Sequence, residues 1–394
     1  MNVAAGLRGR LSALLLALAA VAAPAAALDA AERQRVLAHG PWPLPAALDP
    51  GNRVAGQPAA VALGQLLFFD VRLSPDGRLA CASCHSPAQA FGDGRARGLG
   101  REALDRNTPS LWNAVHQRWW GWDGAADSLW SQAQQPLLDR REMASDPAHL
   151  RRLIERDADL SCRWRQVFGA PPPDDDAALL VQTGKALGAF VGSLVSGRTA
   201  FDRYRDALAR DDRRAQARYP AAAQRGLRLF VGRGRCHLCH AGPLFSNGEF
   251  ADIGARFFVR PGVVDAGRHA GIAALRASAT NLLSAQADAP GDAALKTRHV
   301  QLQHRNFGEF KVPSLRNVAL TAPYLHDGQL ATLQHVLRHY AELDLDRLHA
   351  DGERILQPLH FSAAEQRDLL AFLQSLGDPG ARAWQPAPLP RCKG

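Results

Sequence analysis

The chain has 394 residues, of which 46% are hydrophobic and 22% are charged, and its formal net charge is +9. This composition is typical of a globular protein. The basic residues are spread over predicted helix faces, as in 203–225, without the dense basic block of nucleic-acid-binding chains. Composition and charge therefore exclude nucleic acid as a partner. The excess positive charge either belongs to an ordinary solvated surface or attracts an acidic redox partner.

The first residues predict a secretory signal peptide. Arg8 and Arg10 precede an apolar stretch, 11–23, and the small residues 25–27 offer a cleavage site. An uncleaved anchor is the alternative, but a membrane-spanning helix needs about 20 apolar residues. We therefore expect residues 1–27 to be removed and the mature chain to have no membrane span.

Two Cys-x-x-Cys-His runs carry the chemistry, Cys81–Cys84 with His85 and Cys236–Cys239 with His240. Each pair of thiols can add to the two vinyl groups of a haem, and the following histidine then ligates the iron from the proximal side. A zinc knuckle or a redox dithiol uses related spacing, but two runs that each end in His favour two covalent c-type haems. Because c-type haem is attached outside the bacterial cytoplasm, we expect the protein in the periplasm, an oxidising compartment.

The two haem segments belong to an internal repeat. A predicted helix precedes each motif, a Pro-Ser-Leu turn and an Asp-Gly turn follow it, and apolar helices at 177–195 and 362–376 close the two units. The fold class expected is all-α, with two cytochrome-c-like helical domains. The predicted boundaries are 28–196 for the N-terminal domain, 197–377 for the C-terminal domain and 378–394 for a tail that returns over the surface.

The repeat allows the two haem environments to be compared. Twelve residues past the glycine of each Asp-Gly turn, the first unit has Pro136 and the second has Tyr340. If this position faces the distal side of its haem, the first iron is open and the second is closed by a phenolate oxygen; otherwise Tyr340 is an ordinary packing residue. Methionine cannot easily ligate the second haem, because the mature chain has only Met143, in the first unit.

Three polar or aromatic residues accompany the predicted open haem. The predicted helix 127–143 carries Gln132, one turn before Pro136, and Glu142 near its end. A partly buried carboxylate can move a proton between the two oxygens of a peroxide, although Glu142 could equally be a solvated helix-terminal residue. Trp122 precedes the first Asp-Gly turn and could lie between the haems or simply in a core.

These residues resemble the bacterial di-haem cytochrome c peroxidases, and more closely their MauG-like branch, over nearly all of the mature chain. The resemblance rests on both haem motifs and on several further segments in the same order: Arg106–Pro109, Trp122–Gly124, Gln132, Pro136, Glu142, Val312–Asn317 and Ala322–Gly328.

The resemblance assigns roles to these residues. It implies a peroxidatic first haem, an electron-transferring second haem and a relay through Trp122. It places the distal glutamine and glutamate of the family at Gln132 and Glu142. It also implies one calcium ion between the domains, held by residues that correspond to Asn107, Thr321 and Pro323.

Two departures from conventional members distinguish the chain. The loop 86–105 contains no histidine, so the blocking distal His of conventional peroxidases is missing and the first haem should need no reductive activation. Conventional members also ligate the second haem with Met, whereas Tyr340 occupies that position here, as in the MauG-like branch. Resemblance and repeat spacing agree on Tyr340 as a ligand.

The predicted function is an oxidoreductase that reduces hydrogen peroxide with electrons from a small cytochrome c or copper protein. One alternative is MauG-like oxidative modification of side chains on a partner protein, which the absence of tryptophan from 231–235 disfavours. The other is a non-catalytic di-haem electron carrier or sensor. The sequence leaves a monomer and a homodimer open.

Two features remain unassigned by the sequence. Cys162 and Cys392 could form a disulfide or stay as free thiols. The insertion 254–303 has no predicted role, and His269, His299 and His304 in or beside it are expected at the surface, with ligation of the second haem as the alternative.

Overall fold

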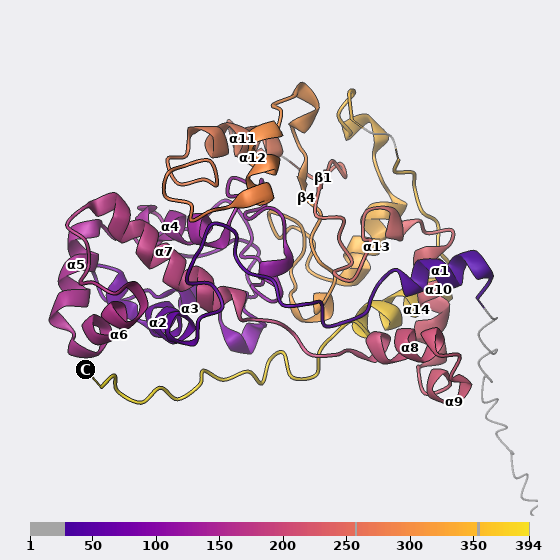
Figure 1. Cartoon of the computed structure of the whole chain (residues 1–394). Coiled ribbons are helices and arrows are strands. Elements are labelled where there is room, and N and C mark those ends of the chain that lie inside the picture. The colour runs from indigo at the N-terminus through magenta and orange to yellow at the C-terminus, as the bar shows by residue number, and fades with distance from the viewer. Residues whose placement is uncertain (1–27, 257, 353–354, 394) are drawn as a thin grey trace, which may run out of the picture.

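The computed structural model describes residues 28–256, 258–352 and 355–393, so the predicted signal peptide lies outside the described residues. The fold is built from helices and long connections, with two small two-stranded antiparallel sheets (Figure 1). This confirms the predicted all-α class. Among the helices described, none is long and apolar enough to cross a membrane. The strands pair as β1 (Phe250–Ala251) with β4 (Phe310–Lys311), and β2 (Phe258–Arg260) with β3 (Val263–Val264).

The first haem motif lies in a group of six helices at one end of the molecule (Figure 1). They are α2 (Pro58–Phe69), α3 (Cys81–Cys84), α4 (Leu129–Leu138), α5 (Pro147–Arg156), α6 (Ala158–Phe168) and α7 (Asp176–Gly192). Their buried side chains form one hydrophobic core that includes Phe68, Trp164 and Phe190.

The second haem motif lies in the group at the other end. Its helices are α1 (Ala30–Leu37), α8 (Ala200–Ala209), α9 (Arg213–Gln216), α10 (Ala221–Val231), α13 (Leu333–Ala341) and α14 (Ala363–Gln374). Their core includes Phe201, Phe230 and Phe372, together with Val36 from α1. The first described helix thus packs with the second half of the chain. The exact domain limits stay a prediction.

Short 3₁₀ helices punctuate the connections. They are η1 (Val71–Leu73), η2 (Pro87–Gln89), η3 (Ala114–His116), η4 (Cys236–Leu238), η5 (Gly291–Ala294), η6 (His304–Asn306), η7 (Val318–Leu320) and η8 (Leu345–Arg347).

Equivalent glycines bring the paired helices of each unit into close contact. A Cβ atom at Gly64 of α2 would lie 2.0 Å from the carbonyl oxygen of Ala186 on α7. A Cβ atom at Gly226 of α10 would lie 1.9 Å from the carbonyl oxygen of Asp368 on α14. No side chain fits at either position, so both crossings depend on glycine.

The repeat is also visible in the connecting turns. Asn113 and Asn317, which precede η3 and η7, both have a φ of 63°, in the left-handed region that asparagine tolerates. The Asn113 backbone N–H donates to Leu194 O at 2.8 Å, just past α7, and the Asn317 N–H donates to Leu376 O at 3.0 Å, just past α14. Both turns are therefore anchored on the closing helix of their own unit.

The insertion 254–303 bridges the two halves. It contains α11 (Arg268–Ala277) and α12 (Leu295–His299), which Figure 1 shows above α4, α7 and the middle of the molecule. Lys185 of α7 forms an ion pair with Asp288 at 2.6 Å, and the Thr297 hydroxyl donates to Asp127 at 2.6 Å. Most of the partners of the insertion thus belong to the first half, although the insertion follows the second haem motif in sequence.

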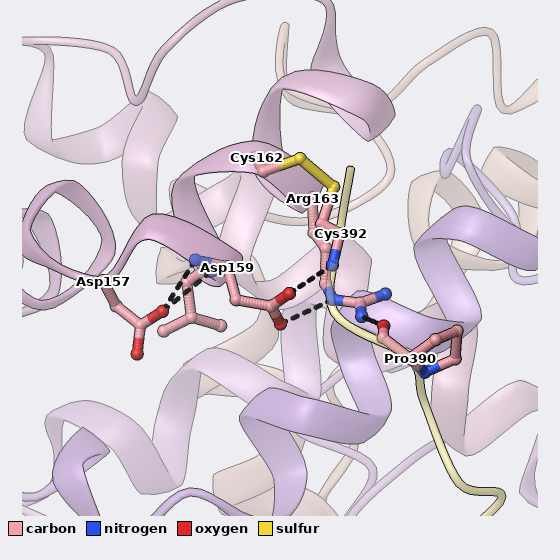
Figure 2. Close-up of a disulfide and its surroundings, with 7 residues drawn as sticks. Asp157, Asp159, Cys162, Arg163, Pro390 and Cys392 are labelled. Carbon is pink, nitrogen blue, oxygen red and sulfur yellow. Dashed lines mark hydrogen bonds and ion pairs between the residues drawn. A yellow bond between two sulfur atoms is a disulfide. The ribbon is translucent and has the colours of Figure 1, made fainter. Parts of the chain in front are cut away.

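The C-terminal tail runs back along the molecule to the first helical group (Figure 1), as the sequence predicted. Trp384 lies against Phe69 and Phe91, with ring centroids 6.2 and 5.1 Å apart. Cys392 forms a disulfide with Cys162 of α6, as Figure 2 shows. The disulfide decides the question that sequence left open and ties the end of the second half to the first.

Candidate active site

The first haem motif forms one turn of helix, α3, so that both thiols and the following histidine project from adjacent positions. His85 Nδ1 donates to the Phe91 carbonyl oxygen at 3.0 Å, which leaves Nε2 for the iron. Ala90 and Phe91 both have positive φ, 53° and 58°, and this turn aims the carbonyl at the histidine. Fixing the ring in this way is what a proximal haem ligand requires.

The second motif repeats this arrangement. η4 begins the motif, and His240 Nδ1 donates to the Phe245 carbonyl oxygen at 2.9 Å. A cavity of about 1330 Å³ adjoins it and is lined by residues that include Cys236, Cys239, His240 and Tyr340. A cavity with two thiols, a buried imidazole and apolar walls fits a covalently attached haem.

Tyr340 lies on α13 and lines the same cavity as the haem-attachment residues. Burial raises the pKa of the Tyr340 phenol well above its ordinary value, and the nearby thiols of Cys236 and Cys239 raise it further. Only a strong positive charge such as ferric iron would make the phenolate favourable here. Ligation of the second haem iron by Tyr340 stays a prediction.

The first unit presents different groups at the equivalent helix. α4 carries Gln132 and, one turn later, Pro136, which has no ligating atom. Gln132 Oε1 is buried and has no hydrogen-bond partner. Such an orphaned acceptor is costly unless a ligand or water satisfies it. The side-chain amide is thus free to interact with a bound molecule.

Glu142 lies beyond the end of α4 and not within it, because α4 stops at Leu138 and the predicted helix 127–143 was too long. The chain reverses there, with Ser145 N–H donating to Leu137 O at 2.7 Å. The returning segment pairs with the loop after the first haem motif, where Arg101 N–H donates to Glu142 O at 3.1 Å. The Glu142 carboxylate is thus positioned by a turn that the loop after the first haem motif holds in place. Helix propensity cannot predict such a turn, because it depends on a contact with a distant segment.

Burial raises the pKa of Glu142 to about 7, and the charge of Asp139 adds to the rise. The Glu142 carboxylate in turn contributes to the raised pKa values of Cys81 and Cys84, after burial as the larger cause. Its charge is therefore felt at the attachment residues of the first haem. A carboxyl group with this pKa can both accept and return a proton near neutral pH.

Trp122 lines the large cavity, and its carbonyl oxygen accepts a hydrogen bond from the Lys311 N–H of the second half at 2.8 Å. Its indole N–H donates to Asn107 O at 2.9 Å, and the Asn107 N–H donates to His326 O at 2.7 Å. His326 is buried and stacks on Phe310 with a centroid separation of 3.5 Å. Trp122 and His326 occupy equivalent positions, each directly before the Asp-Gly turn of its unit. Asn107 thus joins these two turns.

The three residues of the predicted calcium site line one cavity. Asn107, Thr321 and Pro323 all line the large cavity. Asn107 Nδ2 donates to Arg95 O at 2.8 Å, so the side-chain oxygen of Asn107 points away from that bond. Oxygen donors of this kind suit calcium. The ion stays a prediction.

Sequence reasoning missed a group of cations beside Trp119. Arg268 lies over the Trp119 ring at 4.2 Å and Lys296 at 5.3 Å, both from the insertion. Lys311 donates from Nζ to Gln117 Oε1 and to Trp119 O, and burial lowers its pKa to about 8. These contacts join segments that are far apart in the sequence, so no local sequence pattern predicts them.

Two Cys-x-x-Cys-His haem-attachment sites define a two-haem c-type redox protein. The sequence model described as di-haem cytochrome c peroxidase matches residues 58–210. The chain is 33% identical to the methylamine utilization protein MauG of Methylorubrum extorquens, over 82% of this chain and 80% of that protein. It is also 33% identical to the cytochrome-c peroxidase IdrP2 of a Pseudomonas species, over 94% of each chain.

A solved structure agrees with these relatives. A MauG-like protein associated with microbial copper homeostasis superposes with a TM-score of 0.67 at 26% identity, over 87% of this chain and 97% of that one. The chain belongs to the di-haem cytochrome c peroxidase family. It is accordingly an oxidoreductase of the peroxidase class with two c-type haems.

Proposed function

We propose that the protein reduces hydrogen peroxide at the first haem, with electrons that a small periplasmic redox protein delivers through the second. The proposal is supported by the contrast between the residues that the two units carry on and just after their equivalent helices, α4 and α13. The first has Gln132 with an unpartnered buried oxygen and Glu142 with a pKa of about 7, whereas the second has the buried phenol of Tyr340.

The chain's own residues supply binding and proton movement. Haem iron, when present, supplies the site at which peroxide coordinates and the electrons that cleave its O–O bond. Gln132 orients the bound peroxide through its side-chain amide. The Glu142 carboxylate takes the proton from the oxygen nearer the iron and returns it to the departing oxygen, which leaves as water. Two electrons and two protons per hydrogen peroxide give two molecules of water.

The second site acts as a relay, because Tyr340 would occupy the position at which a substrate could bind. Trp122 is the connecting residue in this proposal, since its ring lies in the cavity between the halves and is hydrogen-bonded to Asn107. A calcium ion at Asn107, Thr321 and Pro323 would hold the same region. The Cys162–Cys392 disulfide supports the periplasm as the compartment, because disulfides persist in oxidising surroundings.

Oxidative modification of a partner protein is the second candidate. The chain is as similar to MauG as to the cytochrome-c peroxidase IdrP2, at 33% identity to each. Tyr340 and the loop without histidine suit both activities. The segment 231–235, before the second haem motif, contains no tryptophan for passing oxidising equivalents to a protein surface, and this favours the peroxidase.

The test is steady-state peroxide consumption by the fully oxidised holoprotein, with a reduced small cytochrome c or copper protein as donor. We expect turnover to start without a lag and without prior reduction of the second haem. A protein that turns over only after reductive activation contradicts the open first site. A protein that consumes no peroxide with either donor contradicts the proposed function.

A further inference from the structure

A group of side chains of the kinds that bind metals lies at the edge of the second haem cavity. His304, His349 and Asp351 each offer one ligand atom, and these atoms all lie within 4.8 Å of one another. In the part of the chain that the structure describes, this is the group of three His, Cys, Asp or Glu side chains that could hold an ion. Its members come from two segments that are far apart in sequence.

The two segments already contact one another. His304 begins η6, immediately after the insertion, and its Nδ1 lies 3.3 Å from Asp351 Oδ2. The rings of His304 and His349 meet edge to face, with centroids 4.7 Å apart. The Asp351 N–H donates to His349 Nδ1 at 3.1 Å, which holds the His349 ring beside Asp351, and this bond must be given up when His349 binds a metal.

The backbone holds one side of the group in place. The His349 N–H donates to Asp252 Oδ2 at 2.7 Å, which fixes the 349–351 segment against the chain that follows β1. The side chains of His304 and Asp351 are exposed, so they can move together at low cost. Ligand atoms at 2.0–2.2 Å from a tetrahedral zinc ion are roughly 3.4 Å apart, so atoms that now lie up to 4.8 Å apart need to approach by at most about 1.4 Å.

The donor atoms select the class of metal. Two imidazole nitrogens and one carboxylate oxygen suit Zn²⁺, Cu²⁺ or a similar transition metal, whereas Ca²⁺ and Mg²⁺ prefer oxygen-only sites. We propose that His304, His349 and Asp351 bind one divalent transition-metal ion, with a water in the remaining position.

The ion would act as a clamp at the edge of the second haem cavity. His349 lines that cavity together with Tyr340, and the segment 349–351 follows α13, which carries Tyr340. His304 lies where the insertion ends, and the insertion is anchored on the first half by the Lys185–Asp288 ion pair. A metal that joins His304 to His349 would therefore connect a segment that lines the cavity of Tyr340 to the end of the insertion 254–303, which contacts the first half.

Calorimetric titration of the holoprotein with Zn²⁺ tests the binding. We expect one ion per chain with a dissociation constant below about 10 μM, and at least tenfold weaker binding by His304→Ala. Asp351→Asn should weaken binding as well. His335→Ala is the matched control, because His335 is another exposed histidine near this end of the protein, on α13. Unchanged haem absorption would verify that each variant is folded.

The clamp has its own readout. Arg347 is exposed in η8, two residues before His349, and offers trypsin a cleavage site. Zn²⁺ should slow cleavage there at least fivefold in the wild type and in His335→Ala, and not in His304→Ala. Equal zinc affinity in wild type and His304→Ala would show adventitious binding only and overturn the site. Specific binding without protection at Arg347 would overturn the clamp.

Discussion

The most direct test of the proposed chemistry is Glu142→Gln, which keeps the shape of the side chain and removes its ability to carry a proton. Burial raises the pKa of this carboxyl from 4.5 to about 7, a change that corresponds to roughly 3 kcal/mol. General acid–base groups contribute about 10²–10⁴-fold to a rate. We therefore expect kcat/KM for peroxide to fall by about 100-fold or more, with both haems still attached.

The pH profile makes the test specific. Glu142 must be ionised to accept the first proton, so kcat/KM of the wild type should rise as pH increases through about 7. At pH 6 about one-tenth of the carboxyl groups are ionised and at pH 8 about nine-tenths, which predicts a roughly tenfold increase. Stopped-flow mixing of the oxidised holoprotein with peroxide measures this directly. The Gln variant should lack the rise.

Glu102→Gln is the control for Glu142→Gln. Glu102 belongs to the loop that pairs with the Glu142 segment, and its side chain is 69% exposed. We expect a rate and a pH profile within twofold of the wild type. If Glu142→Gln keeps the wild-type rate, or keeps the rise near pH 7, then Glu142 is not the proton carrier.

Three further changes test the rest of the site and the fold. Tyr340→Phe should abolish the His/Tyr low-spin EPR signal of the second haem and raise its reduction potential, because an anionic oxygen ligand is lost; Tyr324→Phe, in the same cavity, should leave both unchanged. Cys162→Ser should lower the free energy of unfolding in urea by about 2–4 kcal/mol, and an unchanged midpoint would show that the tail disulfide adds no stability. Gly64→Ala should lower it by about 1–3 kcal/mol through the contact with α7, whereas Gly192→Ala, whose nearest neighbour would be 3.6 Å away, should be nearly neutral.

Features repeated within the sequence were the most predictable. The closing helices expected at 177–195 and 362–376 are α7 (Asp176–Gly192) and α14 (Ala363–Gln374). Counting along the repeat also predicts Tyr340 as a residue of the second haem site, and Tyr340 lines the cavity beside the second motif. The two units can be compared position by position, so a sequence pattern that is ambiguous in one unit becomes specific when the other unit repeats it.

Features that depend on distant contacts were not predictable. α4 ends at Leu138 because the chain turns back onto the loop that contains Arg101. Helix propensity depends on local sequence and does not include contacts with that loop. Val36 gives no sign in sequence that its helix packs with the second half. The partner of Cys162 is separated from it by 230 residues, and the pairing required knowledge of the path of the tail.

The proximal sides of the two haem sites are closely alike, and this bears on how the two haems come to differ. Each histidine donates from Nδ1 to a backbone carbonyl, His85 at 3.0 Å and His240 at 2.9 Å. A neutral carbonyl polarises both imidazoles to a similar degree, so the proximal ligand offers little to separate the potentials. We therefore expect most of the difference to come from the predicted distal position, Pro136 in one unit and Tyr340 in the other. A Tyr340→Phe protein whose two haems still differ strongly in potential would contradict this reasoning and shift attention to the cations around Trp119.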